Sequence, residues 1–237
     1  MATNTCEKEW REMQVDSRFN SLGEKIKHFE NFSGTCKGSG NYEVRLSQLY
    51  VLARQFDKAK SIIEQGQTDN TRYAKELLAA KGDMYLIQQD LQSAEIEYRT
   101  AIAKYSNWAD GYAGLGAVFP IEHRYEEGIN YLQKAASIEP SANIYRNLVI
   151  CYYQLRRDKE AIDSFNNAYQ LDNGIFGDRD AAISVAISYA RIGKLDVADD
   201  VLRGLLKVRP AMKDDPEFTA LFKKINDKLD QLPKSDK

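Results

Sequence analysis

The chain has 237 residues, of which 43% are hydrophobic and 29% are charged, a composition ordinary for a soluble helical protein. Its net charge of −2 argues against a nucleic-acid-binding protein, because such proteins normally carry a basic face or stripe. No apolar run approaches the length of a membrane span, so a membrane-spanning protein is not expected either.

The N-terminal part, residues 1–40, is expected to be a helical cap followed by a Gly-rich linker. The first five residues contain neither a basic nor an apolar stretch, so no signal peptide is expected within this sequence. Residues 6–32 read as one or two helices, and the Gly-rich segment 34–40 is the clearest internal hinge. The packing groups expected in this cap are Trp10, Met13, Phe19 and Phe29.

The three cysteines bear on the cellular compartment. Cys151 lies in a predicted helix and is expected to be a buried, small apolar residue. Cys6 and Cys36 bracket an apolar-periodic helix, and two helices folded back on each other would bring them together. A disulfide would indicate an exported or periplasmic protein whose signal peptide was removed, whereas two reduced thiols would fit a cytoplasmic one. We predict the disulfide between Cys6 and Cys36 and keep two reduced thiols as the alternative.

A pattern with a period of 33 to 37 residues fills the chain from about residue 41 to residue 210. Each copy has a small residue that sets its register, a large apolar residue four positions later, and an aromatic residue nine positions earlier. The small residues are Ala59, Ala94, Gly128, Ala161 and Ala198. The large apolar residues are Ile63, Tyr98, Leu132, Phe165 and Leu202. The aromatic residues are Tyr50, Tyr85, Phe119, Tyr152 and Tyr189. Such a period indicates stacked helix pairs, because one short pair cannot bury its apolar face alone.

This pattern resembles the tetratricopeptide repeat (TPR) family, whose signature reads Trp-x-x-Leu-Gly-x-x-Tyr, then Ala-x-x-x-Phe, then Pro. The best copy is made of Tyr112, Leu115, Gly116, Phe119, Gly128, Leu132 and Pro140. The resemblance implies an all-α fold, a right-handed α-solenoid of five helix pairs. The pairs are expected at about 41–74, 75–108, 109–141, 142–178 and 179–210. A plain helical bundle with chance spacing is the alternative.

Two segments depart from the repeat. Residues 172–178 lengthen one period and superficially resemble a calcium loop, but Gly174 stands where an oxygen ligand is needed. The segment is therefore predicted to be a longer connection that exposes Ile175 and Phe176. Residues 214–231 have the pattern of an amphipathic helix, which is expected to cap the stack within a C-terminal part, 211–237.

The sequence contains no recognisable catalytic motif. Its two histidines, His28 and His123, lack Cys, His or acidic neighbours at metal-ligand spacing, and no phosphate-binding loop or nucleophile elbow occurs. We therefore expect a protein that is not an enzyme and that holds neither a metal nor a cofactor.

The resemblance implies that the first helix of each pair lines a concave groove that binds peptides. Candidate contact residues at these positions are Val51, Asp83, Leu86, Arg146, Ile150, Tyr153, Ile183 and Ile187. One subclass of the family clamps a C-terminal carboxylate with Lys, Asn and Arg. Only Arg146, beside Asn143 and Asn147, resembles that chemistry, so the groove is expected to be apolar and to accept an amphipathic helix or extended segment.

Two classes of function follow from this groove. The first is an interaction scaffold whose partner is a peptide or helix of another protein. The second is a self-associating structural or assembly subunit, for example of an envelope complex, whose groove is filled by residues 6–32 or by a second copy. Monomers with an empty groove in light scattering would favour the scaffold.

Overall fold

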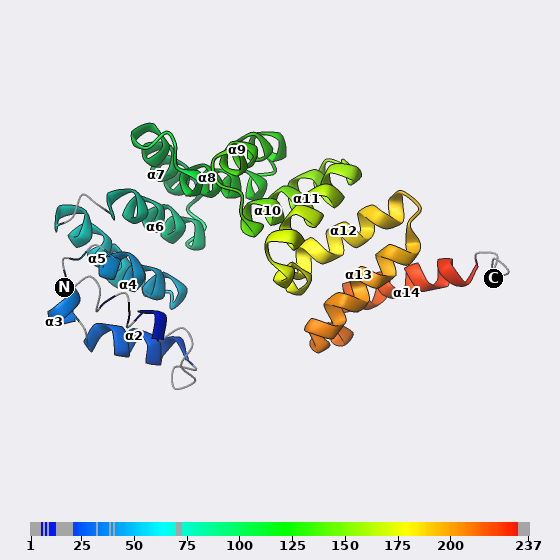
Figure 1. The fold of residues 1–237 in the computed structure, drawn as a ribbon, viewed down its shortest axis with the longest axis horizontal. Coiled ribbons are helices and arrows are strands. Elements are labelled where there is room, and N and C mark those ends of the chain that lie inside the picture. The colour runs from blue at the N-terminus through cyan, green and yellow to red at the C-terminus, as the bar shows by residue number, and fades with distance from the viewer. Residues whose placement is uncertain are drawn as a thin grey trace. The chain divides into compact units, whose positions relative to one another are not determined.

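The computed structural model describes residues 6, 8, 10–12, 21–31, 33–37, 39, 41–69 and 73–231, and no strand occurs among them (Figure 1). Among the described residues before the repeats lie α2 (Leu22–Asn31) and α3 (Ser33–Cys36), and residues 6, 8 and 10–12 are also helical. The five pairs are α4 (Asn41–Leu52) with α5 (Phe56–Asp69), α6 (Ala74–Ile87) with α7 (Leu91–Lys104), α8 (Ala109–Ile121) with α9 (Tyr125–Ile138), α10 (Ala142–Gln154) with α11 (Asp158–Leu171), and α12 (Arg179–Arg191) with α13 (Leu195–Val208). The remaining elements are the 3₁₀ helices η2 (Asn173–Gly177) and η3 (Pro210–Asp214), and the last helix, α14 (Pro216–Asp230).

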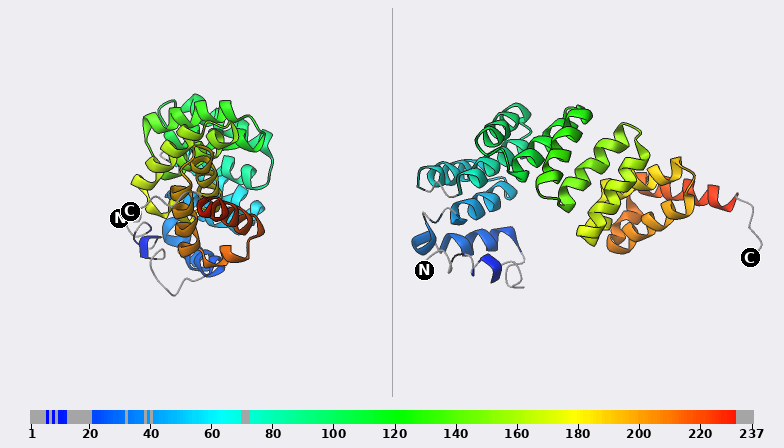
Figure 2. Two further views of the ribbon diagram at one scale, coloured as in Figure 1. Left: turned by 90° about the vertical axis from the view of Figure 1, so that its right-hand side faces the viewer. Right: turned by 45° about the horizontal axis from the view of Figure 1, so that its top comes forward.

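The chain divides into two compact units, Met1–Val118 and Phe119–Lys237, and each has its own core. Within the first unit α4 packs between α2 and α6, so the first helices of successive pairs lie side by side (Figures 1 and 2). Within the second unit α10 packs against α12 in the same way, and α11 contacts both.

The turn inside each pair has the same structure in all five repeats. The residue five positions before the small register residue has a positive φ: Arg54 (57°), Gln89 (64°), His123 (60°), Arg156 (60°) and Gly193 (84°). The next amide N–H donates back to the carbonyl of the repeat's aromatic residue, as Gln55 does to Tyr50 over 2.9 Å. This is the Schellman motif that ends a helix. The aromatic position of the sequence pattern is therefore also where the first helix is closed.

Four of the five residues with this left-handed backbone conformation are not glycine. L-residues with a side chain adopt positive φ at a cost that glycine does not have. Gln89→Gly should therefore raise the free energy of unfolding by about 0.5–1 kcal/mol, whereas Gly193→Ala should lower it by a similar amount. Urea denaturation followed by circular dichroism measures both changes. Destabilisation by Gln89→Gly would contradict the role assigned to this turn.

The close approach of α6 and α8 is filled by a tyrosine ring. Tyr98 of α7 is fully buried, and a Cβ atom added at Gly82 would lie 2.7 Å from its ring. A Cβ atom added at Gly114 would overlap the same ring. The Tyr98 hydroxyl donates a hydrogen bond to Asp83, which fixes the ring along its long axis. Small residues at both glycine positions are thus required by the ring between them.

The connection between the last two pairs differs from the prediction. Residues 173–177 form η2, where Ile175 is buried and the Phe176 ring lies 5.4 Å from Phe165 and 5.2 Å from Tyr169, centroid to centroid. The expectation that Ile175 and Phe176 are exposed is wrong, because the 3₁₀ turn folds them back onto α11 and α13.

Both ends of the described chain are packed. Phe29 of α2 is buried and stacks on Tyr42 of α4, with ring centroids 5.1 Å apart. Phe218 and Ile225 of α14 belong to the core of the second unit. Met13 and Phe19, which were expected in the N-terminal cap, lie outside the described residues.

Candidate functional site

The first unit contains an open pocket of about 440 Å³. Side chains of the helices α2, α4 and α6 contribute to it, together with Trp10. The lining residues are Trp10, Leu22, Lys25, Gln48, Leu49, Val51, Leu52, Ala80, Asp83, Leu86 and Ile87. Since most of these side chains are apolar, the pocket suits an apolar ligand or an apolar side chain of a partner.

Both α4 and α6 line the pocket, and helical spacing explains which of their side chains face it. Gln48 and Val51 lie three residues apart on α4, and Asp83 and Leu86 have the same spacing on α6. Residues three or four apart share a helix face, so each pair points to one side. Leu52 ends α4 at the rim, where 64% of its surface is exposed. Such an exposed aliphatic side chain beside a pocket is available to a partner.

The other wall comes from the segment before the repeats. Cys6 and Cys36 are both buried, their Cα atoms lie 5.7 Å apart, and their sulfur atoms are at bonding distance. The Trp10 ring contacts Phe29 edge-on at 5.5 Å, and the Arg45 guanidinium lies 4.9 Å from its centroid. The disulfide and these ring contacts hold Trp10 against α2 and α4.

One carboxylate faces this mainly apolar pocket. Asp83 accepts the hydrogen bond from Tyr98 described above, and its side chain still reaches solvent. Desolvation by the surrounding protein raises the pKa of the carboxylate; the hydrogen bond from Tyr98 opposes this rise, and the charge of Asp110 adds to it. Within the described chain, no lysine or arginine forms an ion pair with Asp83.

The first helices of the second unit offer a shallower surface. Ile150, Tyr153 and Ile187 are half-buried, whereas Ile183 is 5% exposed and belongs to the core. The Arg191 guanidinium covers the Tyr153 ring at 4.7 Å from its centroid, and it also pairs with Asp158 at 3.1 Å. Tyr153 therefore offers less free surface than its place in the sequence suggests.

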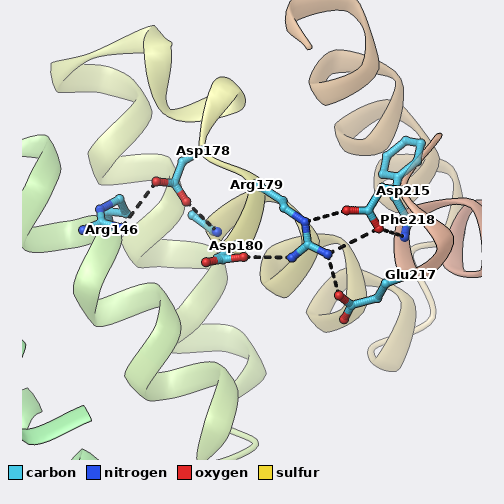
Figure 3. Close-up of polar contacts among 8 residues, drawn as sticks. Arg146, Asp178, Arg179, Asp180, Asp215, Glu217 and Phe218 are labelled. Carbon is cyan, nitrogen blue, oxygen red and sulfur yellow. Dashed lines mark hydrogen bonds and ion pairs between the residues drawn. The ribbon is translucent and has the colours of Figure 1, made fainter. Parts of the chain in front are cut away.

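The charge of Arg146 is already used within the second unit (Figure 3). Its Nη1 atom lies 3.4 Å from Oδ2 of Asp178, whose Oδ1 accepts the Ala181 N–H at the start of α12. A second pocket, of about 230 Å³, lies beside it and is lined also by Asp172 and Asp178. Two carboxylates here would repel a C-terminal carboxylate, which agrees with the expectation that this is not a carboxylate clamp.

No family model matches the sequence, and neither does any curated protein. Solved structures, however, share its architecture. A chain of the APC/C hetero-tetramer Cut9-Hcn1 superposes with a TM-score of 0.72 and 18% identity, over 87% of this chain and 40% of that chain. TTC0263, a thermophilic TPR protein from Thermus thermophilus, superposes with a TM-score of 0.59 and 20% sequence identity, over 77% of this chain and 98% of that chain. The protein has the tetratricopeptide repeat fold. A third structure is that of YrrB, a TPR protein described as having an unusual peptide-binding site. It superposes with a TM-score of 0.56 and 17% sequence identity, over 83% of this chain and 97% of that chain.

The TPR fold explains which predicted groove residues come together. The predicted all-α fold of tetratricopeptide helix pairs is confirmed. Val51, Asp83 and Leu86 share the large pocket, whereas the predicted residues of the second unit do not border it. Trp10, Leu22 and Lys25 also line the pocket, and the repeat pattern gave no signal for them because they precede the first TPR.

The described part of the chain shows neither a metal cluster nor a membrane-spanning helix. No group of three or more His, Cys, Asp or Glu side chains there is placed to hold a metal ion. None of its helices is long and apolar enough to cross a membrane. His123 sits in a turn between paired helices, and its Nδ1 atom lies 2.8 Å from the Tyr125 hydroxyl.

An arginine joins the last TPR pair to the C-terminal helix (Figure 3). Arg179 of α12 contacts three carboxylates, those of Asp180 at 2.9 Å, Asp215 at 2.9 Å and Glu217 at 2.6 Å. Asp215 also accepts the Phe218 N–H at 3.0 Å and so caps α14. This network holds the capping helix on the last TPR.

The network predicts an acid-sensitive C-terminal cap. The hydrogen bond from Arg179 and that from the Phe218 N–H lower the pKa of Asp215 in the folded state. A carboxylate with a lowered pKa contributes stability above its unfolded pKa, near 4, and loses this contribution as the pH falls through the folded value. Acid titration of wild type and Asp215→Asn should show that the variant has lost part of this pH dependence. Identical acid profiles would contradict the assignment.

Proposed function

We propose that the protein is a non-enzymatic interaction scaffold that binds a peptide or amphipathic helix of another protein. The partner would place an apolar side chain in the pocket between α2, α4 and α6. The observation that carries this proposal is the pocket itself, open, about 440 Å³ in volume and lined mainly by apolar side chains. The peptide-binding site described for YrrB, which has the same fold, supports it.

The energetics favour a single anchoring side chain. Burying one leucine or phenylalanine of a partner contributes about 1.5–3 kcal/mol, and a few such anchors dominate most interfaces. Leu52, Leu86 and Ile87 border the pocket on two adjacent helices, so an inserted side chain would contact both. Ile150, Tyr153 and Ile187 are proposed as a contact surface of the second unit, considered by itself.

Self-association is the second candidate. Leu171 and Val208 end α11 and α13, with 51% and 58% of their surfaces exposed. In a structural or assembly subunit, these side chains would be covered by a second copy of the chain. Light scattering over a range of concentrations distinguishes this assembly from a monomeric scaffold.

The compartment forms part of the same proposal. A disulfide between Cys6 and Cys36 persists only where the surroundings are oxidising. We therefore place the scaffold outside the cytoplasm, with an exported or periplasmic location favoured.

The test uses two exposed aliphatic residues of the first unit. Leu52 is 64% exposed and lines the pocket, whereas Ile96 of α7 is 56% exposed and lies outside it. Leu52→Asp should reduce recovery of the co-purifying partner at least about tenfold, because a charge replaces an apolar contact. Ile96→Asp should leave recovery unchanged, and both variants should keep the wild-type melting temperature. Equal recovery with both variants would exclude the pocket as the binding site.

A further inference from the structure

Among the described residues that line the pocket of the first unit, one is positively charged and one is negatively charged, and the two lie on different helices. Lys25 comes from α2 and Asp83 from α6, and α4 lies between these two helices (Figure 1). Gln48 is the remaining polar side chain, and the other lining residues are apolar. Among these described lining residues, the carboxylate that a ligand would meet is that of Asp83, on α6.

Asp83 is held in place before any ligand arrives. Its Oδ1 atom accepts the hydrogen bond of Tyr98, whose ring is fixed between Gly82 and Gly114. The other carboxylate oxygen remains available on a side chain that reaches solvent. A charged group with fixed position loses little conformational entropy on binding, so an added ion pair contributes more to affinity.

The immediate surroundings leave the charge of Asp83 unbalanced. Among the described residues it forms no ion pair, and the carboxylate of Asp110 adds a repulsion of the same sign. Because the Asp83 side chain reaches solvent in an open pocket, water screens this charge in part, so an ion pair or a repulsion at this wall changes affinity modestly.

We infer that the pocket selects a segment in which a bulky apolar side chain is adjacent to a lysine or arginine. The apolar side chain fills the space above α4, and the basic group pairs with Asp83. This rests on the proposed function and adds the chemistry of the partner. A glutamate in place of the basic residue would face Asp83 and be rejected, which is how charged interfaces exclude wrong partners.

The test uses three labelled amphipathic helical peptides that share one apolar face, with leucines at i, i+3 and i+7. The peptides differ only in one residue beside the central leucine, which is Lys, Gln or Glu. Fluorescence anisotropy should show that the wild-type protein binds the Lys peptide about fivefold more tightly than the Gln peptide, and the Glu peptide more weakly still. The preference for Lys should shrink as salt is added.

Two variants assign the preference to one residue. Asp83→Asn removes the charge but keeps an acceptor for Tyr98, so affinity for the Gln peptide should stay unchanged while the preference for Lys disappears. Lys25→Gln, the matched control on the opposite wall, should keep the preference.

The outcomes separate this inference from the proposed function. The inference alone is contradicted if Asp83→Asn still binds the Lys peptide more tightly than the Gln peptide. It is also contradicted if this variant loses affinity equally for all three peptides. If the wild-type protein binds none of the peptides, or if Leu52→Asp binds all of them as well as the wild type does, the peptide-binding pocket itself is wrong.

Discussion

Gly114→Leu is expected to lower the free energy of unfolding of the first unit by about 3 kcal/mol. Any side chain at this position overlaps the ring of Tyr98. The ring has no direction in which to move, because Gly82 lies against it from α6 and its hydroxyl is bonded to Asp83. Urea denaturation followed by circular dichroism measures the loss, and the hydrogen bond to Asp83 should be lost with it.

Gly23→Ala provides the matched control. Gly23 lies in α2, and a Cβ atom added there meets nothing within 4 Å. Because alanine is the better helix former, this variant should be neutral or more stable by up to about 1 kcal/mol. If Gly114→Leu unfolds at the same urea concentration as the wild type, the packing of Tyr98 is not what joins α6 to α8.

Reducing the Cys6–Cys36 bond is expected to cost the first unit about 3–4 kcal/mol. The two cysteines are 30 residues apart, and in the chain-entropy model a closed loop of that length contributes about this much. The segment that carries Trp10 should then separate from α2 and α4, so its fluorescence should shift to longer wavelength. Mass spectrometry of non-reduced protein from its native compartment tests whether the bond is present.

The control for this experiment is Cys36→Ser. This variant should have the stability of the reduced wild type, and reductant should not change it further. Cys151, the remaining cysteine, is buried and unbonded in the second unit, so the stability of that unit should not respond to reductant. Alkylation of both Cys6 and Cys36 without prior reduction would contradict the bond and remove the reason for placing the protein outside the cytoplasm.

Much of the fold could be predicted because each repeat places the same residue types at the same structural positions. The aromatic residues, such as Tyr152, close the first helices, and the small register residues, such as Ala161, are buried in the second. The left-handed turns could not be predicted, because only Gly193 has a residue type that suggests positive φ. Arg54 and His123 adopt the same conformation because the two helices they join require it.

The candidate site could be predicted only in part. Helical spacing places Asp83 and Leu86 on the face that lines the pocket, since both belong to one helix. Trp10 and Lys25 come from segments before the repeats, and their positions depend on contacts with α4 that no local pattern specifies. Ile183 is predicted to line the groove but lies in the core, because α12 is buried on more sides than the repeat pattern indicates.

The most direct test of the account is photo-crosslinking in the native host. A photoreactive amino acid at Leu52, on the rim of the pocket, should join to one segment of one partner protein, and that segment should contain an apolar residue beside a basic one. The same probe at Ile96, similarly exposed but outside the pocket, should not capture that segment. Capture of the same proteins from both positions, or capture at Leu52 only of a second copy of this chain, would contradict a peptide-binding scaffold.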